Sequence, residues 1–154
     1  MVRRELIYIS SGDEQVPYNQ TTDRDQQIEL QQEKFDNKAN GYHYVVLIDR
    51  TTATDAPRGE TRGSGRGGFM TVSGTISDQD MTFVFMHELG HLLGISSDTY
   101  RGVDTQAVPF AEYPSIMNYN TPQDHISYAG SESGFNDWEY IEQNLSSNNN
   151  WVRK

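Results

Sequence analysis

The chain contains no cysteine and no long apolar run, and only three of its twelve basic residues are lysines. Without cysteine it can form neither a disulfide nor a thiolate zinc site, so redox chemistry gives no indication of its compartment. The apolar stretch near the N-terminus, residues 6–9, is shorter than the core of a signal peptide, and no segment approaches transmembrane length. We therefore expect a soluble chain, either secreted or cytoplasmic, with no membrane partner.

Positive charge is also scarce. The 22 acidic residues outnumber the 12 basic ones, which gives a formal net charge of −10. Such a surface repels polyanions at long range, which argues against nucleic acid as a partner. The chain has 154 residues, of which 34% are hydrophobic and 11% aromatic, and this is enough for one domain with its own core. We expect a single domain spanning residues 1–154, and a monomer.

The most informative motif occupies residues 87–94 and reads HELGHLLG. On an α-helix, positions i and i+4 differ by about 40° around the axis, so the imidazoles of His87 and His91 share one face and can bind one metal. Glu88 would lie beside that metal, where its carboxylate can take a proton from a zinc-bound water. The spacing therefore predicts a zinc hydrolase with Glu88 as the general base.

The helix that carries this motif also has recognisable ends. Ser77 followed by Asp78 and Asp80 supplies an N-cap and first-turn acidic residues, and Gly94 is expected to end the helix. Apart from the histidines and Glu88, residues 81–93 are apolar nearly all round, which predicts a helix buried inside the domain. Charged groups lose hydration there, and coordination of a cation would offset that loss. A hydrogen-bonded pair of core histidines is the alternative.

Two further features extend the motif. Gly94 follows His91 by three residues, and residues 115–119 read SIMNY. With these parts in this order, the chain resembles the metzincin clan of zinc peptidases, in which the extended motif ends in a third histidine or aspartate and a methionine-containing turn lies beneath the metal. The form of residues 115–119 is similar to the Met-turn of astacins and serralysins. The resemblance covers about residues 66–119.

The resemblance implies a fold and a function. The fold is an α+β zincin-like domain, in which a twisted mixed sheet with a backing helix is followed by the zinc helix, the Met-turn and a C-terminal helix. The function is that of a Zn²⁺-dependent endopeptidase, acting on a peptide or protein substrate. In this family the tyrosine matched by Tyr119 is a hinged zinc ligand or donates a hydrogen bond to the transition state. Met117 would form a hydrophobic floor below the metal.

The third metal ligand has more than one candidate. The consensus position holds Ser97, a poor zinc ligand, whereas Asp98 follows with an anionic oxygen that zinc accepts. We predict Asp98 as the ligand, with Asp104 in the same connecting segment as the rival. A third-ligand glutamate on a separate helix would nominate Glu112, but two prolines flank that residue and disfavour a helix there.

Outside the motif the pattern predicts strands at residues 5–10, 42–49 and 68–74, helices at residues 23–38 and 135–145, and a flexible run at residues 51–68. In the metzincins the strand before the zinc helix is the edge strand. Its free backbone groups can pair with an extended peptide. We therefore predict substrate binding by the start of that strand, which comprises Gly68, Phe69, Met70 and Thr71.

Two other functions stay open beside the peptidase. The missing consensus ligand at Ser97 is compatible with a catalytically weak or inactive zincin-fold protein that binds peptides. A structural zinc site is disfavoured, because such sites usually close with four protein ligands and often use thiolates. Two histidines and a carboxylate also accommodate iron, cobalt or manganese. The isolated His43 and His125 are expected to make ordinary hydrogen bonds.

Overall fold

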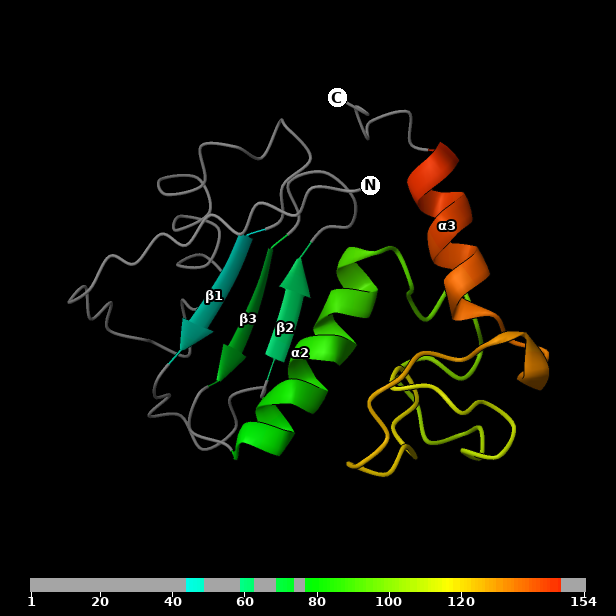
Figure 1. Ribbon diagram of the computed structural model, residues 1–154, viewed down its shortest axis with the longest axis horizontal. Helices are drawn as coiled ribbons and strands as arrows, with labels where there is room; N and C mark the ends of the chain where they lie inside the picture. Colours follow the sequence, from blue (N-terminus) through cyan, green and yellow to red (C-terminus); the bar gives the residue numbers. More distant parts are fainter. Residues whose placement is uncertain (1–43, 49–58, 63–68, 74–76, 148–154) are drawn as a thin grey trace.

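The computed structural model describes residues 44–48, 59–62, 69–73 and 77–147 (Figure 1). Its elements are, in order, β1 (Tyr44–Ile48), β2 (Gly59–Arg62), β3 (Phe69–Ser73), α2 (Asp78–Leu92), the short 3-10 helix η2 (Ser131–Ser133) and α3 (Asp137–Ser147). The strands predicted at residues 42–49 and 68–74, the helix that carries the HELGH motif and the C-terminal helix are thus confirmed. The strand predicted at residues 5–10 and the helix predicted at 23–38 lie outside the described residues.

The three described strands form a mixed sheet in the order β1-β3-β2. β1 runs parallel to β3, with Val46 opposite Thr71, and β2 runs antiparallel to β3, with Thr61 opposite Met70. β3 is therefore the central strand, and the expectation that it forms the edge of the sheet is wrong.

The sequence pattern does not predict β2, because this strand lies within residues 51–68, where the composition predicts a flexible run. Its four residues, Gly59–Arg62, contain no alternation of apolar and polar side chains that would indicate a strand. Pairing with β3 along its whole length makes it one, as tertiary context often does for sequences of weak strand propensity.

α2 packs against β2 and β3 and lies between the sheet and the C-terminal part of the chain (Figure 1). Its first turn begins as predicted: the Ser77 hydroxyl oxygen accepts a hydrogen bond from the Asp80 backbone N–H at 3.2 Å, and Asp78 adds negative charge at the positive end of the helix dipole. None of the described helices is long and apolar enough to cross a bilayer.

The core described by the structure belongs to the C-terminal part, residues 93–147, most of which has no regular secondary structure. Its buried apolar side chains come from the loops after α2 and from α3, namely Ile95, Val103, Val108, Tyr113, Ile116, Met117, Tyr128, Ala129 and Ile141. On α3, Ile141 is buried, whereas Trp138 is 55% exposed with its ring edge-on to Tyr128. These loops lack the backbone hydrogen bonds of helices and sheets, and buried polar side chains provide hydrogen bonds there instead.

Asp137 is the centre of one such polar network and is fully buried at the start of α3. Its carboxylate accepts hydrogen bonds from the Tyr113 hydroxyl at 2.8 Å, the Ser115 hydroxyl at 2.5 Å and the Ala129 backbone N–H at 2.9 Å. Burial raises the pKa of this carboxyl, although these bonds act in the opposite direction. The network joins α3 to the segment 115–119 that resembles a Met-turn.

We expect Asp137→Ala to lower the free energy of unfolding by about 2 kcal/mol or more, because it leaves three donors without their acceptor. Urea unfolding followed by fluorescence measures this change. Asp124→Ala is the matched control, since Asp124 is exposed and its replacement should leave the midpoint unchanged. Equal midpoints for the two variants would contradict the stabilising role of the network.

Candidate metal centre

The end of α2 sets the geometry of the site. Gly94 has a φ of 103°, a left-handed conformation that glycine adopts without steric cost. The Gly94 N–H donates to the His91 carbonyl and the Ile95 N–H to the Gly90 carbonyl, both at 3.0 Å. These are the two bonds of a Schellman motif, so the predicted helix stop at Gly94 is confirmed. The turn carries the chain back across the face of α2 that bears His91.

That turn fixes the ring of His91. Its Nδ1 lies 2.8 Å from the Ile95 carbonyl oxygen. A carbonyl oxygen only accepts hydrogen bonds, so Nδ1 must carry the hydrogen, and in the neutral ring Nε2 then keeps its lone pair. His91 is thus held in the tautomer in which Nε2 can bind a metal.

His87 is held in the same way from the opposite side. Its ring is buried, and Nδ1 lies 2.9 Å from the carbonyl oxygen of Ile116, within the segment 115–119. The same reasoning gives an N–H at Nδ1 and a free lone pair at Nε2. Metal-binding histidines commonly use their second nitrogen in this manner, which orients the ring and raises its basicity as a ligand.

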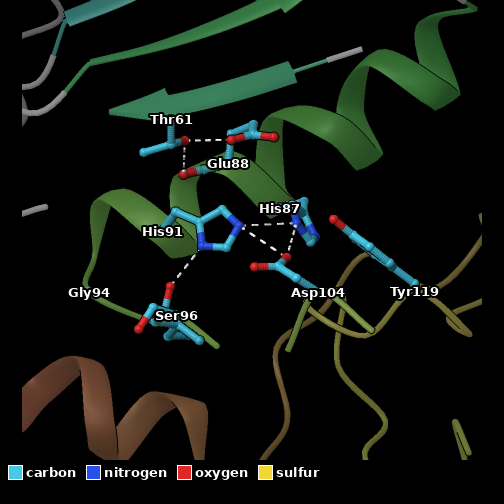
Figure 2. Close-up of a pocket in the computed structure, with 9 residues that line it drawn as sticks. Thr61, His87, Glu88, His91, Gly94, Ser96, Asp104 and Tyr119 are labelled. Carbon is cyan, nitrogen blue, oxygen red and sulfur yellow. Dashed lines mark hydrogen bonds and ion pairs between the residues drawn. The ribbon is translucent and has the colours of Figure 1, made fainter. Parts of the chain in front are cut away.

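Asp104 completes the group. Its Oδ1 lies 3.0 Å from Nε2 of His87 and 3.3 Å from Nε2 of His91, and the two Nε2 atoms are 3.2 Å apart (Figure 2). The backbone of Asp104 has a φ of 56°, a left-handed conformation that aspartate tolerates better than most residues. Its N–H donates to the Met117 carbonyl at 3.0 Å. The segment 115–119 therefore holds both His87 and Asp104.

The spacing of these three atoms fits a tetrahedral zinc site. Zinc binds imidazole nitrogen and carboxylate oxygen at about 2.0–2.2 Å, so ligand atoms at tetrahedral corners lie roughly 3.3–3.6 Å apart. The observed separations of 3.0, 3.2 and 3.3 Å are close to that range. Among the residues that the structure describes, His87, His91 and Asp104 form the one group of three or more with ligand atoms close enough to hold a metal ion.

Asp104 and His91 each favour the charged form of the other. Burial alone would raise the pKa of Asp104, but hydrogen bonds and attraction from His87 and His91 hold it well below its usual range. Burial alone would lower the pKa of His91, but its bonds to Asp104 and to the Ile95 carbonyl, with the Asp104 charge, raise it. Both shifts favour a carboxylate beside a positive charge, which a bound cation could also supply.

Asp98, the predicted third ligand, is not in this group. It is exposed in the turn of residues 97–99, and Ser97 beside it is exposed as well. Glu112 is also elsewhere, because its carboxylate forms a surface ion pair with Arg101 at 3.2 Å. The structure thus brings the rival, Asp104, to the two histidines.

Glu88 is 7% exposed and contacts the sheet. Its carboxylate oxygen Oε2 accepts a hydrogen bond from the Thr61 hydroxyl of β2 at 2.5 Å, and the Glu88 main-chain carbonyl lies 3.0 Å from the same hydroxyl (Figure 2). Thr61, Glu88, the three metal-binding candidates and Tyr119 all line one pocket of about 440 Å³. The Glu88 carboxylate thus lines the same pocket as the three candidate ligands without belonging to that group.

Tyr119 lines the pocket and is 56% exposed. Its ring stacks on that of His87, with centroids 5.8 Å apart and an interplanar angle of 28°. Burial, together with the negative charges of Asp104 and Glu88, raises the pKa of its hydroxyl. The group therefore stays protonated at neutral pH and can donate a hydrogen bond into the pocket.

The strand predicted to bind substrate, β3, lies at the centre of the described sheet. The backbones of Phe69, Met70 and Thr71 pair with β1 on one side and with β2 on the other, so they offer no open edge. Gly68 lies outside the described residues. β2 is the strand that reaches the pocket, through Thr61.

Sequence reasoning missed Thr61 and the carbonyls of Ile95 and Ile116. Thr61 lies in a run whose composition indicates turns. Every residue has a main-chain carbonyl, so residue types do not indicate which carbonyls contact the histidines. Of these contacts, the sequence indicates only the one made by the Ile95 carbonyl, because a Schellman turn at Gly94 returns the chain toward His91.

Comparison with known proteins gave no significant match to a protein-family model, to a curated protein or to a solved structure. The resemblance to metzincins therefore rests on the residues of this chain alone.

Proposed function

We propose that this chain is a zinc-dependent peptidase with a zincin-like α+β fold similar to that of the metzincins. One observation carries the proposal. Two histidines with fixed tautomers and Asp104 direct three ligand atoms to a common point, at separations of 3.0–3.3 Å. Three protein ligands leave a coordination position for water or substrate, which is the arrangement of catalytic zinc sites.

The chemistry follows from the groups around that point. When bound, zinc would lower the pKa of a water molecule and polarise a carbonyl oxygen. Glu88 takes a proton from the attacking water and returns it to the amine that leaves as the carbon–nitrogen bond breaks. The Tyr119 hydroxyl donates a hydrogen bond to the oxygen that gains negative charge, which is worth about 2–4 kcal/mol for comparable donors.

The substrate class is a peptide or protein in extended form. β2 stands at the end of the described sheet and lines the pocket through Thr61, which supports a peptide lying alongside this strand rather than β3. Backbone pairing of this kind demands little of the substrate sequence, and the walls of the pocket then set the preference for side chains.

Zinc removal tests the proposal. We expect the purified protein to hold one zinc per chain by elemental analysis and to cleave a quenched casein substrate. Cleavage should stop on treatment with 1,10-phenanthroline and return on addition of Zn²⁺, because the metal supplies the activated water. A protein that binds no metal, or that cleaves equally well after its removal, would contradict the proposal.

A further inference from the structure

The contact between Thr61 and Glu88 joins two elements that are 27 residues apart in sequence. Thr61 is half-buried in β2, and Glu88 is buried in α2. The single hydroxyl of Thr61 lies within hydrogen-bond distance of the Glu88 carboxylate, at 2.5 Å, and of its main-chain carbonyl, at 3.0 Å. Both acceptors belong to one residue, so the contact defines where that residue sits and where its side chain points.

Gly59, two residues before Thr61 in β2, also affects where the Glu88 side chain lies. Alternate residues of a strand face the same side, so Gly59 and Thr61 both face α2. A Cβ atom on Gly59 would lie 2.5 Å from Cγ1 of Val84, 2.7 Å from Cγ of Glu88 and 2.9 Å from its Oε1. The absence of a side chain at Gly59 thus leaves space for Glu88, while the hydroxyl of Thr61 holds it.

We propose that Thr61 is a positioning residue for the general base: its hydroxyl fixes the Glu88 carboxylate on β2, beside the metal ligands. This inference rests on the proposed peptidase function. A glutamate side chain has three rotatable bonds and loses considerable rotamer freedom when it is ordered. Displacing a reacting group by about 1 Å can reduce a rate about 100-fold. A bond that orders Glu88 before substrate arrives therefore favours the chemical step.

The position of Thr61 on β2 gives the contact a second consequence. If an extended peptide lies along β2, the strand that aligns the substrate is the strand that holds the base. The distance between Glu88 and the scissile bond is then set by a single element, and it changes little when other loops move. Catalytic groups supported by rigid strands and helices are held more accurately than groups supported by loops.

Thr61→Val and Thr61→Ser test the inference. Valine keeps the size and β-branching of threonine without its hydroxyl, and serine keeps the hydroxyl. We expect Thr61→Val to lower kcat by about 10- to 100-fold with KM changed by less than about twofold, because Glu88 loses its alignment but the ligands and β2 remain. Thr61→Ser should recover most of kcat. All three proteins should hold the same amount of zinc.

Crystal structures of the metal-free proteins give a readout that does not depend on activity. The Glu88 carboxylate should contact residue 61 in the parent and in Thr61→Ser, and should adopt another rotamer in Thr61→Val. Gly59→Ala should also displace Glu88 and lower kcat, because its new Cβ needs the space that the side chain fills. Gly130→Ala is the matched control, since a Cβ there would meet nothing within 4 Å.

The outcomes separate the two proposals. An active parent with an equally active Thr61→Val protein would overturn the positioning role and leave the peptidase function intact. A serine variant as slow as the valine variant would overturn it as well, because the hydroxyl would then not be the group that matters. A parent that cleaves nothing would overturn both.

Discussion

Asp104→Ala is expected to reduce zinc affinity by more than about 100-fold, since changes to residues that only contact zinc ligands already cost about 10- to 100-fold. The variant leaves two histidines where three ligands converged, and it removes the only negative charge among the three. Cleavage of casein should disappear at the same time. Dialysis against a competing chelator followed by elemental analysis measures the affinity, and the cleavage assay measures the activity.

Two further variants make this result specific. Asp98→Ala removes the aspartate that the sequence favoured, and we expect it to bind zinc as the parent does, because Asp98 is exposed and outside the group. Asp104→Asn keeps a residue that tolerates a φ of 56° but lacks the negative charge, so it separates ligand loss from backbone strain. Zinc loss in Asp98→Ala with normal binding in Asp104→Ala would move the metal ligand to Asp98.

Glu88→Gln is expected to lower kcat by about 10²- to 10⁴-fold, the usual contribution of a positioned general base. Glutamine has nearly the same shape and can still accept a hydrogen bond from Thr61, but it cannot take a proton from water. Zinc content should be unchanged, because Glu88 is not one of the three converging ligands. Steady-state kinetics on a quenched peptide, with zinc measured in the same samples, checks both statements.

The control for this variant is Glu142→Gln, which makes the same chemical change at an exposed position on α3. It should leave kcat at the parent value. A Glu88→Gln protein that cleaves as fast as the parent would exclude Glu88 as the base. A parent that binds zinc and peptides but cleaves none would instead favour the alternative function, a zincin-fold peptide-binding protein.

The sequence determined the local parts of this candidate site. The cap at Ser77, the apolar run and Gly94 specified a helix from its first turn to its last, and the helical repeat placed His87 and His91 on one face with Glu88 between them. The strands β1 and β3 could also be predicted, because most of their residues are β-branched or aromatic. Each of these features depends on residues that are close together in the sequence. Over such short distances, propensity and periodicity predict secondary structure well.

The tertiary structure decided which distant residues join them. Asp98 and Asp104 are equally suitable in chemistry, and only the fold of the loop after Gly94, with the Asp104 N–H bonded to Met117, brings Asp104 to the histidines. Likewise, pairing with β3 turns residues 59–62 into a strand, places β3 at the centre and brings Thr61 to Glu88. The physical reason is that such contacts depend on loop geometry and strand pairing between residues far apart in the chain, and neither leaves a periodic pattern in the sequence.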